Sequence, residues 1–141
     1  MSVLGPRLRD LTTLSVTFRR LGEIFRIRNG RDHEQLGDGE IPVYGSGGIM
    51  RYADEFSYDK PSVLIPRKGS LGNLFYVEEP FWNVDTIFYT EIDQAQVVPK
   101  FLYYFLMTAG LGDMNQAGGV PSQTQTRLNE VSVPLPGSGS V

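Results

Sequence analysis

Short runs of β-branched and aromatic residues, each bounded by proline, glycine or asparagine, constrain this chain more than any other feature. Three such runs lie in its middle: Ser62 to Pro66, Leu74 to Val77 and Trp82 to Thr90. Residues of these types fit the pleated, half-buried surface of a sheet, so each run predicts a strand. Because strand signals come first along the chain and helical signals come late, the order favours an α+β domain over alternating βαβ units.

Three further strands are predicted outside this central region. The first covers Glu23 to Arg28 and ends at Asn29-Gly30, a pair that favours positive φ in turns. A short strand over Ile41 to Tyr44 is expected to lead into a flexible glycine loop, and a last strand covers Val131 to Pro136. Together the runs predict a twisted, mixed β-sheet.

Two helices are predicted to pack on this sheet. Pro99 opens the first, which covers Lys100 to Leu111 and carries apolar residues at helical spacing. These residues are Phe101, Leu102, Phe105, Leu106 and Ala109. The second helix covers Gln123 to Glu130, with Ser122 as its cap. The predicted fold is therefore a single α+β domain, a twisted mixed β-sheet with a few packed helices.

The chain is long enough for about one domain, with 141 residues of which 40% are hydrophobic. Residues 1–20 show no clear period and are expected to be an N-terminal extension. Residues 21–136 are predicted to form the domain, and residues 137–141 a flexible Gly/Ser tail.

Several chemistries are excluded by composition. The sequence holds no cysteine and one histidine, His33, so this chain alone cannot supply a thiolate nucleophile, a Cys/His metal site or a His-containing triad. His33 lies in a polar loop and is interpreted as a solvated surface side chain. No apolar run approaches the about 18 residues of a membrane span, and no secretory signal opens the chain. We therefore expect a cytoplasmic protein with neither a cofactor nor a bound metal.

Charge is distributed unevenly along the chain. Residues 1–31 hold seven arginines and two acidic residues, whereas residues 32–141 hold six basic and fourteen acidic residues. The acidic total opposes a free-standing nucleic-acid binder, which normally makes several phosphate contacts. Binding to nucleic acid would require basic residues to converge locally, or a partner subunit to supply most of the phosphate affinity.

Two segments nevertheless have the chemistry of phosphate contacts. The run from Tyr44 to Gly48, which includes Ser46 and Gly47, could form a nest of backbone amides for a phosphate, although it lacks the ending of a nucleotide P-loop. A plain flexible turn is the alternative. Arg67-Lys68 follows a strand, which places two cations at the rim of a sheet, where Arg51, Lys60 and Arg127 could join them. Isolated surface cations are the alternative here.

Base contacts are suggested by a polar block near the end of the chain. Gln123, Gln125 and Arg127 follow a Pro-Ser pair, and glutamine can read adenine while arginine can read guanine in the major groove. An ordinary exposed helix face would give the same pattern. Trp82 lies in a strand-like run where core packing is expected, with stacking on a base as the less favoured interpretation.

The order of these segments resembles the target recognition domain of type I restriction-modification specificity subunits. The resemblance covers Leu21 to Pro136 and rests on the blocks IPVYGSGGI, PRKGS and FWNVDT, followed by GGVPSQTQTRLNEVSVPLP. The family block after Pro-Ser more often continues with Leu-Thr, where this chain has Gln123-Thr124. Family members usually carry two such domains, each followed by a long spacer helix, and this sequence shows one domain block.

The resemblance implies a bacterial defence module that is not itself an enzyme. The domain would read one half of a bipartite site in double-stranded DNA, while partner adenine-N6 methyltransferase and restriction subunits perform methylation and cleavage. The residues expected to contact DNA are Tyr44, Ser46, Gly47, Arg51, Arg67, Lys68, Gln123, Gln125 and Arg127.

Two rival hypotheses stay open at this stage. A protein-interaction or regulatory domain that docks a methyltransferase without touching DNA would use the acidic charge of residues 32–141. A hydrolase built on paired carboxylates such as Asp54-Glu55 is less favoured, because acidic pairs in turns are usually solvated surface.

Overall fold

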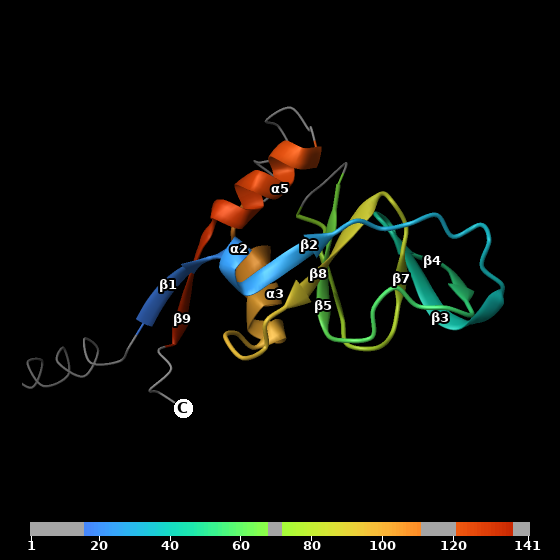
Figure 1. Ribbon diagram of the computed structural model, residues 1–141, viewed down its shortest axis with the longest axis horizontal. Helices are drawn as coiled ribbons and strands as arrows, with labels where there is room; N and C mark the ends of the chain where they lie inside the picture. The colour runs from blue at the N-terminus through green and yellow to red at the C-terminus, as the bar shows by residue number, and fades with distance from the viewer. Residues whose placement is uncertain (1–15, 68–71, 111–120, 137–141) are drawn as a thin grey trace, which may run out of the picture.

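The computed structural model describes residues 16–67, 72–110 and 121–136, and its largest sheet has four antiparallel strands in the order β2-β8-β5-β6. These strands are β2 (Phe25–Arg28), β5 (Ser62–Pro66), β6 (Phe75–Val77) and β8 (Ile87–Ile92). Figure 1 shows this sheet in the middle of the molecule. Every residue of β5 is buried, in keeping with its uninterrupted apolar run.

A second, three-stranded sheet has the order β4-β3-β7 and lies at the right of Figure 1. Its strands are β3 (Asp38–Gly45), β4 (Gly48–Ala53) and β7 (Trp82–Asn83). β3 pairs antiparallel with β4 and parallel with β7, so the strand arrangement is mixed, as predicted. The strand over β4 is not predicted from the sequence, and the expected flexible loop before it is a tight turn.

A third sheet pairs two strands that are far apart in the sequence, β1 (Val16–Arg20) and β9 (Ser132–Pro136). The last predicted strand is thereby confirmed. No strand is predicted over β1, because its residues, VTFRR, follow a stretch of mixed residues without a clear period. The pairing holds both ends of the described chain together at the left of Figure 1.

Three helices of the described residues complete the α+β fold: α2 (Leu21–Ile24), α3 (Pro99–Met107) and α5 (Pro121–Glu130). α2 occupies the start of the predicted strand Glu23 to Arg28, because the Glu23 carboxylate accepts the Arg20 amide hydrogen at 2.9 Å and favours a helical turn there. The strand itself begins only at Phe25.

The later helices differ from expectation at their ends. α3 ends at Met107, where the Thr108 hydroxyl donates to the Phe105 carbonyl at 2.8 Å, whereas residue 111 lies outside the described residues. α5 starts at Pro121, so Ser122 lies inside the helix and is not its cap. Proline is favoured at a first helical position because its missing N–H would be unpaired there anyway.

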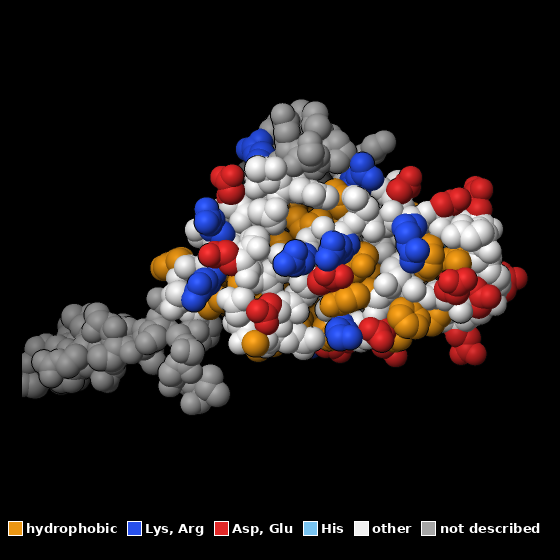
Figure 2. All heavy atoms as spheres, viewed as in Figure 1, with side chains coloured by type: hydrophobic (Ala, Val, Ile, Leu, Met, Phe, Trp, Pro, Cys, Tyr) orange, Lys and Arg blue, Asp and Glu red, His pale blue; other side chains and the backbone are white. Residues whose placement is uncertain are grey.

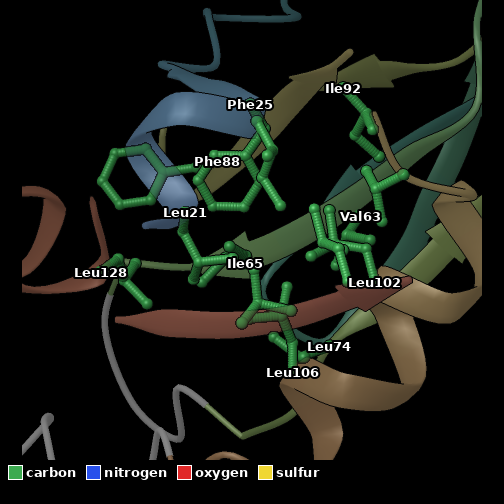
Figure 3. Packing of buried hydrophobic residues seen from close by; sticks show 14 residues of the cluster. Leu21, Phe25, Val63, Ile65, Leu74, Phe88, Ile92, Leu102, Leu106 and Leu128 are labelled. Atoms are coloured by element: carbon green, nitrogen blue, oxygen red, sulfur yellow. The ribbon is translucent and has the colours of Figure 1, made fainter. Parts of the chain in front are cut away.

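The main core lies between the four-stranded sheet and the helices, as Figure 3 shows. Phe88 and Ile65 from the sheet pack with Leu102 and Leu106 from α3 and with Leu128 from α5. The helical spacing predicts the two α3 leucines correctly. Phe101 of the same helix is 40% exposed, so only part of the predicted apolar face is buried.

Candidate nucleic-acid interface

Three chain segments meet along one edge, which we call the turn edge. It consists of the turn Gly45–Gly48 between β3 and β4, Arg67 directly after β5, and the turn Val84–Thr86 between β7 and β8. Thr86 joins them, since its hydroxyl accepts the Ser46 amide hydrogen at 3.2 Å and its carbonyl accepts the Arg67 amide hydrogen at 3.0 Å. The turn edge is thus organised by hydrogen bonds before any ligand arrives.

The β3–β4 turn exposes its tip to solvent. Gly45 pairs with Gly48, which leaves Ser46 and Gly47 as the two turn residues. Gly48 has φ of 117°, a conformation that favours glycine. A Cβ added at Gly47 would meet no atom within 4 Å. The asparagine side chain of Asn73 donates to the Ser46 carbonyl at 3.5 Å and ties the turn to the segment before β6.

Arg67 is held in place by neighbouring backbone and by an aromatic ring. Its Nη1 donates to the Asp85 carbonyl at 2.9 Å, and its guanidinium carbon lies 5.6 Å from the centre of the Phe88 ring. The buried Nε has no hydrogen-bond partner, and no ion pair within the described residues involves this side chain. An oriented guanidinium without a carboxylate partner is suited to an anionic ligand such as phosphate.

The turn Val84–Thr86 divides the predicted strand Trp82 to Thr90 into β7 and β8. The Asn83 side-chain amide donates to the Ile87 carbonyl at 2.8 Å, and the Ile87 amide hydrogen is accepted by the Val84 carbonyl at 3.2 Å. Asn83 is fully buried, so this bond is shielded from water. Asparagine and aspartate two residues apart are a turn signal that could have located the break.

The segment after β2 presses closely against this turn. The Arg31 amide hydrogen is accepted by the Asn83 carbonyl at 2.9 Å, and a Cβ at Gly30 would overlap the Val84 carbonyl oxygen. Gly30 is not among the described glycines with positive φ. β2 ends at Arg28 beside Asn29-Gly30, as predicted, but the glycine is required by close backbone approach and not by a positive φ.

Replacing Gly30 by alanine is expected to lower the free energy of unfolding by about 1–3 kcal/mol, because backbone must shift to admit the methyl group. Urea denaturation followed by circular dichroism measures the effect. The matched control is Gly47→Ala, which enters open space and should change stability by less than about 0.5 kcal/mol. Equal stability of the two variants would contradict the close approach.

Among the predicted DNA-contacting residues whose side chains the structure describes, Arg51 has the most hydrogen bonds. Its guanidinium donates to the carbonyls of His33 at 3.1 Å, Leu36 at 3.1 Å and Gly37 at 3.2 Å, and it forms an ion pair with Asp38 at 3.2 Å. These bonds organise the loop before β3. Lys60, which precedes β5 and pairs with Asp59 at 3.5 Å, lies at the opposite end of that strand from Arg67.

Gln125 and Arg127 lie on α5, away from the hydrogen bonds of the turn edge. Gln125 lines a groove together with Arg26 of β2, and Arg127 is exposed. In Figure 1 the amino-terminal end of α5 and the carboxyl-terminal end of β5 both lie along the upper edge of the molecule. Lys68 lies outside the described residues, as does the side chain of Gln123, whose backbone belongs to α5.

The groove beside Gln125 has mixed charge. Two arginines of β2, Arg26 and Arg28, line it, and so do the carboxylates of Glu23, Glu91 and Asp93. Hydrogen bonds from Gln96 and from the Ala95 amide lower the pKa of Asp93, so its carboxylate stays ionised at neutral pH. The groove is therefore better suited to hydrogen bonds with base edges than to gathering phosphates.

Charged side chains separate across the surface. On the face in Figure 2, most lysine and arginine side chains lie over the middle and left of the molecule, whereas aspartate and glutamate gather at the right-hand end, over β3 and β4. A phosphate backbone would be attracted to the former part and repelled by the latter. The Gly45–Gly48 turn lies at the opposite end of the β3–β4 hairpin from Asp38, which begins β3, and from Asp54, which follows β4.

Three features of the interface are not found by sequence reasoning: the linking role of Thr86, the Asn73 contact, and the position of Arg26 beside Gln125. All three depend on pairing between segments distant in sequence. Among the described residues, no group of three or more metal-ligating side chains is placed to hold a metal ion. In the same part of the chain, no helix has the length and apolar character that crossing a membrane requires.

The fold is similar to that of known specificity subunits. The type I restriction-modification S subunit from M. genitalium aligns with a TM-score of 0.70 at 23% identity, over 95% of this chain and 37% of that one. The HsdS subunit from Thermoanaerobacter tengcongensis gives a TM-score of 0.62 at 17% identity, over 86% and 33%. A chain from a study of complex assembly and conformational transition of the type I R-M system gives 0.60 at 16%, over 89% and 35%.

These likenesses define the class of fold as α+β, and the chain spans about a third of the length of the chains that it resembles. The sequence itself matches the model of the type I restriction modification DNA specificity domain over residues 15–139. The chain therefore belongs to this family, and the resemblance noted from the sequence is confirmed. No curated protein matches the sequence.

Proposed function

We propose that the domain reads one half of a bipartite DNA site by laying the turn edge and the start of α5 against a duplex. The observation that carries this proposal is the hydrogen-bonded convergence of Ser46, Arg67 and Thr86, segments that lie far apart in the sequence. Ordered donors lose little conformational freedom on binding, so their contacts contribute more to affinity.

In this proposal, some residues contact phosphates and others contact base edges. Arg67, the Ser46 hydroxyl and the Gly47 backbone amide contact phosphates and set the register of the duplex, while the Ser46 amide stays bonded to Thr86, and Lys68 extends this contact. Gln123, Gln125 and Arg127 reach base edges from α5, where a glutamine amide can bond adenine at N6 and N7. Arg51 bonds the loop before β3 and Tyr44 contacts the rings of Phe75 and Phe81, and a direct contact of either residue with DNA stays a prediction.

In the same proposal, other polypeptides carry out catalysis. Adenine-N6 methyltransferase and restriction subunits would bind the assembled specificity subunit and act on the DNA that this domain recognises. Partner subunits would also supply phosphate contacts, which offsets the net charge of −3 carried by this chain. The domain requires no cofactor for reading DNA.

Selection from a pool of duplexes with a randomised centre tests the proposal. The wild-type chain is expected to enrich a short, fixed run of base pairs. In Gln125→Ala, preference at one base pair of that run should relax by about 1–3 kcal/mol, because the amide that reads the base is gone. The matched control is Gln94→Ala, which removes an exposed glutamine after β8 that does not line the groove and should leave every preference unchanged.

The outcomes of this selection separate the alternatives. Unchanged preference at every position in Gln125→Ala would remove that residue from base reading. Failure of the wild-type chain to bind any duplex, in mobility shifts at low salt, would favour the rival protein-interaction domain that docks a methyltransferase.

A further inference from the structure

A groove on the other side of the β3–β4 hairpin has a composition unlike that of the turn edge. We call it the tyrosine groove. Three tyrosines line it, Tyr44 and Tyr52 from the hairpin and Tyr76 from β6, and three glutamates, Glu40, Glu78 and Glu79, surround them. Val43, the neighbour of Tyr44, is buried against Trp82 instead, since alternate side chains of a strand point to opposite faces.

The glutamates of the groove are not neutralised by nearby cations. Lys100 is the one basic residue of the described chain that lines the groove, and no ion pair among the described residues involves Glu40, Glu78 or Glu79. All three glutamates are exposed. The groove therefore has a net negative charge and a surplus of hydrogen-bond acceptors.

The tyrosines present ring surface to the same space. Tyr52 is 51% exposed and Ile49 beside it is 48% exposed. The Tyr76 hydroxyl donates to the Glu78 carboxylate at 2.7 Å, and burial together with this bond raises the pKa of Tyr76 to about 12. Burial and the charges of Tyr52 and Glu79 raise the pKa of Tyr44. Both rings therefore stay neutral. Tyr76 stacks on Tyr103 and Tyr44 contacts Phe75 and Phe81, so the exposed ring of Tyr52 offers the most open face to a cation.

An exposed aromatic face beside carboxylates that form no ion pair is suited to bind a guanidinium group. A guanidinium can stack on a tyrosine ring while its N–H groups bond a carboxylate in bidentate fashion, and it is more weakly hydrated than an ammonium. DNA is repelled by the same carboxylates. We propose that the tyrosine groove docks an arginine-bearing segment of a partner protein subunit. The positive charge of the arginine side chain complements the net negative charge of the groove.

Of the described residues expected to contact DNA, Tyr44 alone lines the groove, so the docking proposal does not rest on DNA reading. Its test is a titration of the full chain, observed through backbone amide shifts in NMR, with the peptide acetyl-Gly-Arg-Gly-Arg-Gly-amide. Saturable shifts are expected in residues of the groove. A peptide with citrulline in place of arginine keeps the shape but not the charge, and should bind at least fivefold more weakly.

Variants make the site assignment specific. The double variant Glu78→Gln/Glu79→Gln should weaken peptide binding at least fivefold, whereas Glu55→Gln, which removes an exposed carboxylate outside the groove, should leave it within twofold. Tyr52→Ala removes an exposed ring without disturbing the core and should also weaken binding.

Three results would overturn the docking proposal: no saturable shifts, equal weakening by Glu55→Gln, or groove shifts on addition of a 20-base-pair duplex in place of the peptide. A chain that binds the peptide and fails to bind DNA would contradict the proposed function alone. Unfolding midpoints of all variants are measured in parallel, and Glu40→Gln replaces the double variant if that variant does not fold.

Discussion

In Arg67→Ala, affinity for duplex DNA is expected to fall about 10- to 150-fold, by a similar factor for every sequence. The guanidinium is oriented by the Asp85 carbonyl and the Phe88 ring, and it forms no ion pair with any of the described residues. A phosphate contact from such a group is charged and hydrogen-bonded, but it carries no sequence information.

The salt dependence of binding distinguishes a phosphate contact from a merely structural role. The slope of log K against log salt should become shallower by about 0.9 in Arg67→Ala, since one fewer counterion is released. Arg67→Lys keeps the charge and should keep the slope. Lys60→Ala removes an exposed cation at the far end of β5 and should change neither slope nor affinity. An unchanged slope in Arg67→Ala would remove this residue from the phosphate contacts.

Replacing Trp82 by alanine should lower the free energy of unfolding by about 3–5 kcal/mol. The ring is 2% exposed and packs with Val43 and Val84, its Nε1 donates to the Arg31 carbonyl at 3.1 Å, and the Arg31 guanidinium lies 4.4 Å from the ring centre. The structure thus places this side chain in the core, as expected from the sequence, and leaves it unavailable for stacking on a base.

Urea denaturation followed by circular dichroism measures the loss in Trp82→Ala. Trp82→Phe is the matched comparison, because it keeps most of the packed volume and loses the indole donor, and its cost should be smaller. Trp82 is the one tryptophan of the chain, so its fluorescence reports unfolding in every other variant. A cost below about 1 kcal/mol for Trp82→Ala would contradict its place in the core.

The sequence predicts the strands best where apolar residues run without interruption. β5 has the predicted bounds, because all five of its residues are buried and their order alone signals a strand. β1 and β4 lack this signal. β1 is stabilised by pairing with the distant strand β9, and β4 by pairing with the adjacent strand β3. Ile49 and Met50 of β4 are about half exposed, at 48% and 54%. Pairing of this kind is tertiary and leaves little trace in residue order.

The candidate site is predicted in part for a similar reason. Ser46 and Arg67 stand out because a glycine-rich turn and a cation after a strand have recognisable chemistry, and the structure brings their segments together through Thr86. Arg51 has the same residue type as Arg67 but its donors are directed at the loop before β3. Residue type alone cannot distinguish these two environments, since each depends on which carbonyls lie nearby.

The absence of native cysteine allows the central claim, that the turn edge lies against DNA, to be tested by site-directed cross-linking. A thiol introduced by Gly47→Cys enters open space at the tip of the β3–β4 turn, and a thiol introduced by Asp59→Cys lies at the opposite end of β5. Each variant is labelled with a benzophenone maleimide and irradiated with a randomised duplex pool at low salt. We predict cross-linked DNA from the Gly47→Cys variant and little from the Asp59→Cys variant. Cross-linking from Asp59→Cys alone would contradict the account.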